Sequence, residues 1–302
     1  MASVLVKGGQ VLHISSDIVG MKFKEYRTEV TWRQTTNYAA AVGDNNPCYL
    51  DDRGPEELIA HPMFVAALTW PIQQNLHQYV DIAQIQEAFR TAVHYTERLE
   101  VFRPIKPGDR VVIRGEVLAV MPHDAGTYLV FKLPVEDGDG NPIVTEYVGG
   151  MMRGVRCSDG GKGWENLPVA PRHVPNSSKV WQADIPISKD APYVYDGCTN
   201  IVFAIHTSPR FARSVGLSGI IYQGTATLAL AVRELVNREA GGNPARLNLL
   251  SARFGGMVLP GTNISIQLLQ RLEKSDSAEL YFQVINSQGH KAISGGYARL
   301  TY

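Results

Sequence analysis

Two spacings of apolar residues follow one another along the first half of the chain. Apolar side chains recur every three or four positions in residues 35–42 and 62–79, which predicts two helices, although Pro71 must break or kink the second. From residue 91 onward apolar and polar side chains alternate, which is typical of strands buried on one face. The expected strands cover residues 91–102, 110–120, 127–135 and 143–153, and the turns between them are rich in Gly, Pro and Asp.

The same order of elements returns in the second half. Residues 157–177 keep no regular spacing and are dominated by Gly, Pro and Ser, so we expect them to form a linker. A short helical piece at residues 208–215 precedes a clear helix at residues 225–237, whose apolar side chains share one face. The expected strands of this half cover residues 179–186, 247–257, 263–271, 278–286 and 291–301.

The two halves also resemble each other in sequence. Three matched pairs share similar offsets: Pro107-Gly108 and Pro260-Gly261 by 153 residues, Gly43 and Gly197 by 154 residues, and Gly140 and Gly289 by 149 residues. Such offsets in the same order predict a duplicated α+β unit, an antiparallel sheet curved around a central helix. We expect the first unit in residues 1–156, the linker in 157–177 and the second unit in 178–302. Pairing of the two sheets would remove an exposed edge from each.

Composition narrows the class of protein. The 302 residues carry a formal net charge of zero, which gives no reason to expect a nucleic acid or an anionic membrane as partner. No apolar run reaches the length of a membrane span, and the N-terminus lacks the pattern of a signal peptide. Cys48, Cys157 and Cys198 form no spaced framework, which favours a reducing compartment and argues against a zinc site. We therefore expect a cytoplasmic protein.

The segment 200–239 carries the clearest candidate chemistry. His206 lies in an apolar run, and Gln223 and Gly224 lead into the long helix. The first N–H groups of a helix lack internal partners and favour negative charge, so this terminus suits the enolate of a thioester. His206 is then a candidate general base. Locally, however, a single histidine in an apolar run is more often a hydrogen-bonded core residue.

A family resemblance gives these motifs a context. The tandem repeat, the order GDNNP then PGD, and the segment HTSPRFARSVGLSGIIYQGTATL together resemble the MaoC-like dehydratases, which include the (R)-specific enoyl-CoA hydratases. The resemblance covers roughly residues 15–155 and 178–302. It implies a double hot-dog fold, two antiparallel sheets each wrapped on a central helix. It also implies fatty-acid metabolism, in which water is added reversibly to a 2-enoyl thioester without a metal or prosthetic group.

This chain divides the family signature between its halves. In the family, an Asp and a His in Gly-Asp-x-Asn-Pro-x-His jointly activate one water, and a backbone N–H at the helix start polarises the thioester carbonyl. The first half keeps Asp44 and Asn46 of that segment but has Tyr49 in place of the His. The second half keeps His206, with Ser208 where the family has the Asp of Asp-Pro-x-x-Ala, and Gln223-Gly224 takes the place of the family's His-Gly.

The carboxylate of the second half is missing in either alignment. Counted back from His206, the family's Asp falls on Ile201; aligned on the Gly, it falls on Cys198, with Asn200 in the Asn position. Asp196 is the nearest acid, and it fits neither alignment.

Three interpretations stay open. In the first, the second half is active, with His206 as base and Asn200, Thr207 or Ser208 orienting the water. In the second, Asp44 of the first half meets His206 in a composite site. In the third, the chain is a non-catalytic binder of acyl thioesters, and a thioester hydrolase on the same fold is a further alternative.

The expected site residues follow from these interpretations. His206, Asn200, Asp44 and Gly224 are the catalytic candidates, and the substrate contacts are expected from Gln223, Thr225, Ser208, Asn46 and Tyr49. The partner is an acyl-CoA or an acyl-carrier-protein thioester, and a homo-oligomer is possible. The other histidines rank lower: His61 and His77 form no metal triad, and His94, His123, His173 and His290 are expected to be solvated.

Overall fold

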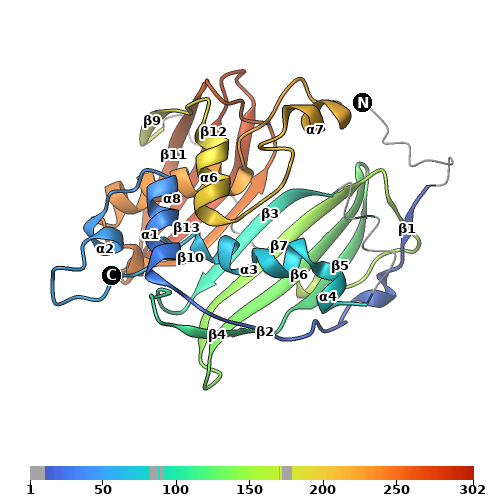
Figure 1. The fold of residues 1–302 in the computed structure, drawn as a ribbon, viewed down its shortest axis with the longest axis horizontal. Helices are drawn as coiled ribbons and strands as arrows, with labels where there is room; N and C mark the ends of the chain where they lie inside the picture. Colours follow the sequence, from blue (N-terminus) through green and yellow to red (C-terminus); the bar gives the residue numbers. More distant parts are fainter. Residues whose placement is uncertain (1–10, 82–87, 89–91, 170, 172–178) are drawn as a thin grey trace.

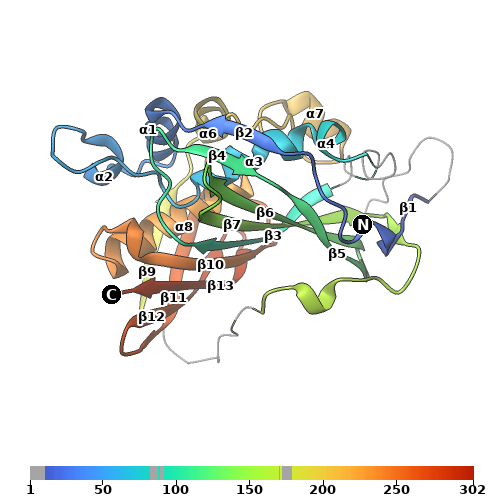
Figure 2. The ribbon, with the colours of Figure 1, turned by 90° about the horizontal axis from the view of Figure 1, so that it is seen from below.

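One antiparallel sheet runs through the whole molecule. The computed structural model describes residues 11–81, 88, 92–169, 171 and 179–302. Within these residues the strand order is β2-β4-β6-β7-β3-β10-β13-β12-β11-β9, and β5 pairs with β6 (Figure 1). Seen from below, α1, α3, α4, α6 and α7 lie on one side of this sheet (Figure 2). No helix in these described ranges has the length and apolar character needed to cross a membrane.

The first half supplies five strands of the sheet besides β2. Its elements are β2 (Tyr26–Glu29), α1 (Trp32–Ala41), α2 (Pro47–Leu50), α3 (Phe64–Gln74), α4 (Leu76–Tyr79), β3 (Ala92–Val101), β4 (Arg110–Ile113), β5 (Glu116–His123), β6 (Gly126–Asp137) and β7 (Pro142–Arg153). The expectation of a single strand over residues 110–120 is wrong. The strand divides at Gly115, where a Cβ would lie 2.5 Å from the Phe23 ring and 2.7 Å from Leu133. The expected second helix is likewise divided at Asn75, whose backbone N–H and side chain both donate to the Pro71 carbonyl.

The second half repeats this plan. Its elements are β9 (Trp181–Pro186), α6 (Ala191–Thr199), α7 (Pro209–Ser214), α8 (Gly224–Glu239), β10 (Leu247–Phe254), β11 (Asn263–Glu273), β12 (Ser277–Ile285) and β13 (Lys291–Thr301). Short pieces complete the described chain: β1 (His13–Ile14), β8 (Arg156–Cys157), and the 3-10 helices η1 (Ser16–Ile18), η3 (Trp164–Asn166) and η4 (Pro244–Arg246). Helix α6 was not expected. The boundaries of the linker remain a proposal, because residue 170 and residues 172–177, including His173, lie outside the described ranges.

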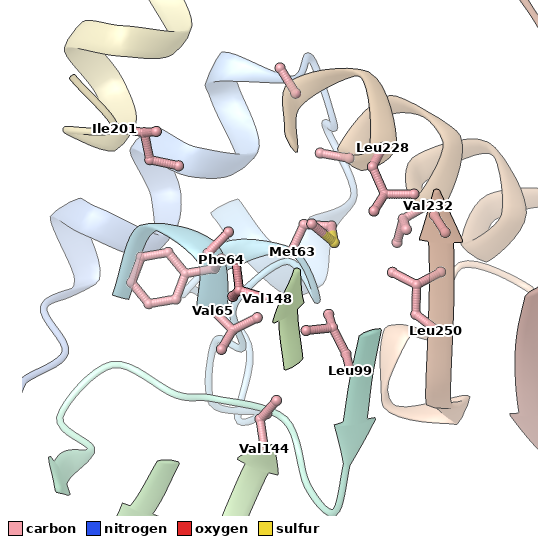
Figure 3. Packing of buried hydrophobic residues seen from close by; sticks show 14 of the residues in the cluster. Met63, Phe64, Val65, Leu99, Val144, Val148, Ile201, Leu228, Val232 and Leu250 are labelled. Atoms are coloured by element: carbon pink, nitrogen blue, oxygen red, sulfur yellow. The ribbon is translucent and has the colours of Figure 1, made fainter. Parts of the chain in front are cut away.

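The halves join through β3 and β10. These strands pair antiparallel, with Arg98 opposite Ser251. The predicted pairing of the two sheets is therefore confirmed, and neither half keeps an open edge at the junction. On the helical side α1 packs against α6, and the hydroxyl oxygens of Tyr38 and Tyr195 lie 3.0 Å apart. Apolar side chains of both halves form one core, shown in Figure 3 by residues such as Met63, Leu99, Leu228, Val232 and Leu250.

Backbone geometry corrects the alignment of the repeat. Helix α1 is followed by Gly43 with φ 60°, and α6 is followed by Asn200 with φ 57°. Glycine and asparagine are the residues that most readily take this left-handed conformation at a helix end. Asn200 is therefore the counterpart of Gly43, and the prediction that Gly197 matches Gly43 is wrong. The same spacing of 157 residues separates Tyr38 from Tyr195.

Candidate active site

The start of α8 is an uncapped helix terminus. Gln223 precedes the helix in an extended conformation, and its side chain makes no capping hydrogen bond. The Gln223 amide instead donates to the Pro192 carbonyl at 2.9 Å. The first N–H groups of α8 are thus left without a side-chain acceptor, and the helix dipole favours an anion there.

His206 lies directly beside this terminus. Its Nδ1 is 2.8 Å from the carbonyl oxygen of Ile221, three residues before Gly224. A carbonyl can only accept, so Nδ1 carries the proton and Nε2 presents its lone pair. Burial lowers the pKa of His206 to about 4, with the Ile221 carbonyl acting in the opposite direction. The ring is therefore neutral at neutral pH and has the tautomer of a base.

The other expected residues of the second half have structural roles. Asn200 is exposed and closes α6, Ser208 caps α7 by accepting from the Phe211 N–H at 3.2 Å, and Thr225 is buried and accepts from the Tyr195 hydroxyl at 3.1 Å. Gly224 sits against Phe254, because a Cβ built on it would lie 3.1 Å from the ring. Chemical roles for these four residues stay predictions.

The corrected alignment also locates the missing carboxylate. With a spacing of 157 residues, Tyr49 corresponds to His206 and Asp44 to Ile201. Ile201 is buried, with 6% of its surface exposed. Asp196 lies on α6, where burial raises its pKa against a hydrogen bond from the Phe203 backbone. The second half thus keeps the imidazole and the helix terminus but has an apolar side chain in the acid position.

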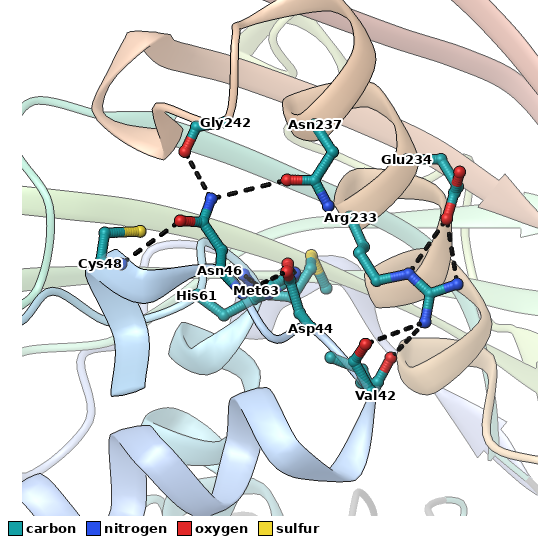
Figure 4. A network of polar contacts seen from close by, with 11 residues as sticks. Val42, Asp44, Asn46, Cys48, His61, Met63, Arg233, Glu234, Asn237 and Gly242 are labelled. Atoms are coloured by element: carbon teal, nitrogen blue, oxygen red, sulfur yellow. Dashed lines mark hydrogen bonds and ion pairs between the residues drawn. The ribbon is translucent and has the colours of Figure 1, made fainter. Parts of the chain in front are cut away.

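The first half holds a different polar cluster, which sequence reasoning missed. His61 and Asp44 are both buried, and His61 Nε2 lies 3.8 Å from Asp44 Oδ2 (Figure 4). His61 Nδ1 accepts from the Met63 N–H at 3.1 Å, so Nε2 carries the proton that faces the carboxylate. The Tyr49 ring lies 5.7 Å from the imidazole, and its buried hydroxyl has no partner among the described residues. His61-Pro62 comes just before α3 much as Gln223-Gly224 comes at the start of α8, and this likeness is the signal that could have identified His61.

Burial shifts the pKa values of His61 and Asp44 in opposite directions. Burial lowers the pKa of His61 to about 3, and the Arg233 charge lowers it further, against the Ala229 backbone. Burial raises the pKa of Asp44, against hydrogen bonds from the Asn46 backbone and the Asn237 side chain. The cluster therefore holds a neutral imidazole beside a carboxyl that resists ionisation.

Asp44 and His206 occupy opposite ends of α8. Asn46 donates to Asn237 and Gly242, and Arg233 donates to the Val42 carbonyl at 2.7 Å (Figure 4). These contacts hold Asp44 beside the last turns of α8, whereas His206 contacts Ile221, just before its first turn. Asn237 follows Gly224 by thirteen residues, which is roughly 20 Å along a helix. The structure does not bring Asp44 and His206 together.

The helix start of the first half also differs in its donors. The first N–H groups of that start have acceptors, because the Met63 N–H donates to His61 Nδ1 and the Phe64 N–H donates to the His61 carbonyl. Met63 caps α3 without a side-chain hydrogen bond. The first half therefore keeps the carboxylate but has a helix start whose first N–H groups are occupied, and the second keeps free N–H groups without the carboxylate.

Two family models match the chain in tandem. Residues 17–146 match the FAS1-like dehydratase domain region, and residues 174–291 match the MaoC like domain. The peroxisomal enoyl-CoA hydratase 2 of Arabidopsis thaliana is 21% identical over 304 residues and covers 93% of both chains. The peroxisomal multifunctional enzyme type 2 of Drosophila melanogaster is 25% identical over 221 residues, 71% of this chain; the match spans only 35% of the fly enzyme.

The fold of this chain also superposes on solved structures of other proteins. A MaoC-like dehydratase from Phytophthora capsici superposes with a TM-score of 0.81 at 23% identity, covering 94% of this chain and 97% of that one. A Mycobacterium tuberculosis protein described as a double hotdog fold superposes with a TM-score of 0.59 at 14% identity, covering 95% and 97%. With a dehydratase region in one half, a MaoC-like domain in the other and a continuous sheet between them, the chain belongs to the MaoC-like double hot-dog family.

Proposed function

We propose that this protein hydrates a 2-enoyl thioester, or dehydrates a 3-hydroxyacyl thioester in the reverse direction, at the start of α8. The observation that carries the proposal is the His206 hydrogen bond to the Ile221 carbonyl. That bond fixes the tautomer in which Nε2 is a free base, beside an uncapped helix terminus.

The chemistry needs only water and the thioester. His206 Nε2 takes a proton from water while the water oxygen bonds to C3 of the enoyl group. The C2–C3 electron pair moves onto the thioester oxygen, where the N–H of Gly224 or Thr225 stabilises the negative charge. The protonated ring then returns the proton to C2, so that the two parts of one water molecule are added. Known relatives support this reaction class, since two of them are named as an enoyl-CoA hydratase and a peroxisomal multifunctional enzyme.

The test is a turnover assay in both directions. Purified chain is given short, branched, dicarboxylic and long enoyl-CoA esters, and loss of the enoyl absorbance is followed. We expect His206→Ala to lower kcat by about 10²–10⁴-fold while the fold survives, because a general base of this kind contributes that much. His77→Gln is the matched control, since His77 is an exposed histidine on α4. A folded His206→Ala protein with normal kcat would remove His206 from the mechanism.

A second candidate function is non-catalytic binding of acyl thioesters. Ile201 in the acid position favours it, because an apolar side chain there cannot hold a water for attack. This function predicts that acyl-CoA binds in calorimetry while neither enoyl absorbance nor free thiol changes. Release of free thiol would instead indicate the thioester hydrolase. Three expectations stay predictions: that an acyl-carrier protein can carry the thioester, that the protein is a homo-oligomer, and that it is cytoplasmic.

A further inference from the structure

An irregularity in β3 places two titratable side chains on one face. His94 pairs with Gly150 of β7 and Thr96 pairs with Gly149, so Tyr95 is an extra residue in β3. Residues three positions apart in a regular strand point to opposite faces, but one inserted residue restores them to the same face. His94 and Glu97 therefore point the same way, and His94 Nε2 lies 2.9 Å from Glu97 Oε2. The expectation that His94 is simply solvated is wrong.

His94 packs against a residue that borders the start of α8. The ring centroid of His94 lies 4.5 Å from that of Phe254. The Phe254 ring is also the group that a Cβ on Gly224 would meet. Strand pairing explains the approach, because β3 and β10 run antiparallel and the beginning of β3 therefore meets the end of β10. About a quarter of the His94 side chain is exposed, whereas the Glu97 side chain is fully covered.

A hydrogen bond to Thr96 fixes the tautomer of His94. Its Nε2 also lies 3.1 Å from the Thr96 carbonyl, which can only accept, so Nε2 carries the proton. Nδ1 then carries the lone pair. In His206, by comparison, the free lone pair is on Nε2.

A second carboxyl stands behind Glu97. Glu146 lies on β7, two residues from the Val148 that pairs with Glu97, so both side chains share one face. Both are buried, the two carboxyls interact with each other, and Glu146 also interacts with the Thr69 side chain. Burial raises the pKa of both carboxyls, and the neighbouring Glu97 raises that of Glu146 further. A proton held by Glu146 is thus available to bond Glu97.

We propose that His94, contributed by the first half and oriented by Glu97, is a second catalytic group at the α8 terminus and replaces the carboxylate that Ile201 lacks. The inference rests on the proposed hydration. One water donates its two O–H bonds to His206 Nε2 and His94 Nδ1 and attacks C3 with its oxygen. Whichever ring takes the proton returns it to C2, so no further reactant is needed. If it is His94, the neighbouring Glu97 carboxyl stabilises the positive charge of the resulting imidazolium.

The experiment compares four variants of the full chain with trans-2-butenoyl-CoA as substrate. We expect His94→Gln and His94→Ala to lower kcat by about 10²-fold or more with little change in KM, as for a lost acid/base group. Added imidazole should restore part of the rate of His94→Ala. Glu97→Gln, which tests a positioning residue, should lower kcat while the midpoint of thermal unfolding does not fall. His77→Gln should behave as wild type.

The outcomes separate this inference from the proposed function. Wild-type protein without turnover in either direction overturns both. Active wild type with normal kcat in folded His94→Gln, or with a change in KM alone, overturns the role of His94 and leaves His206 as the sole base. If His94→Ala fails to fold, His94→Gln decides, because glutamine keeps most of the side-chain volume and a donor near Nε2. A Glu97→Gln protein that only loses stability would make Glu97 structural.

Discussion

Substitution of Gly224 separates catalysis from packing at the start of α8. A Cβ on Gly224 would lie 3.1 Å from Phe254 Cδ1 and 3.4 Å from Cε1, so even Gly224→Ala requires the ring to give by a few tenths of an ångström. Gly224→Val adds two methyl groups at the same place. Overpacking of this kind costs about 1–3 kcal/mol of folding stability. A thioester oxygen kept from the helix N–H costs about 10²–10³-fold in kcat.

The two effects appear in different measurements on the same preparation. We expect Gly224→Val to lower both kcat and the midpoint of thermal unfolding. Gly197→Ala is the matched control, because a Cβ at that position in α6 meets nothing within 4 Å. A large loss of stability with unchanged kcat in the folded fraction would refute the oxyanion role.

A double variant sharpens the distinction. Phe254→Leu removes the ring that crowds position 224, so Gly224→Ala combined with Phe254→Leu should regain stability. If kcat stays low in that protein, relative to Phe254→Leu alone, the side chain at position 224 blocks the N–H. If kcat returns together with stability, the loss of kcat in Gly224→Ala came entirely from crowding of Phe254 and, through Phe254, of His94.

Three further predictions concern the acids. Asp44→Asn should change kcat by much less than the roughly 10²-fold expected of a lost base, because the Asp44 side chain interacts with Asn237 near the far end of α8. Steady-state kinetics measure this, and a loss as deep as that of His206→Ala would contradict it. Burial raises the pKa of Glu97 from 4.5 to about 8, so the folded state holds a proton that the unfolded chain releases. The free energy of unfolding should therefore fall as pH rises from 4.5 to about 8, and urea titrations of Glu97→Gln across this window should show a shallower fall. Ile201→Asp, added to His94→Ala, should recover part of the lost rate and lower thermal stability. The reason is that the substitution buries a carboxylate five positions before His206. An unchanged rate in the folded double variant would count against position 201 as the acid position.

Most of the fold could be predicted because strand periodicity depends on local sequence alone. The alternation in residues 127–135 and 291–301 reports directly which side chains meet the core, and both strands form there. Helix α6 was missed because Gly197 and the β-branched Val194 and Thr199 weaken its helical pattern, and packing against α1 compensates only in the folded chain. The register of the repeat was misread because glycine and asparagine satisfy the same left-handed position, so matching letters pointed to the wrong residue.

The candidate site could be predicted only for residues that lie close together in the sequence. His206 and Gly224 lie in one segment, and the resemblance placed them in order before the contact with Ile221 was known. His94 and Glu97 could not be found in this way. Their approach to α8 depends on the pairing of β3 with β10 and on one inserted residue at Tyr95, and neither leaves a local pattern in the sequence.

Tyr38 and Tyr195, whose hydroxyl oxygens lie against each other, occupy matching positions in the two halves. Other matching positions can hold different residues. In a symmetric dimer of single hot-dog units, every substitution occurs twice, so a proline at one helix start is a proline at both. Here each half is encoded separately. The start of α3 can use its first N–H groups within the chain while that of α8 leaves them free, and β3 can carry an inserted residue at Tyr95 while β10 carries one at Asn248. Covalent duplication thus lets one half specialise in supporting the chemistry of the other.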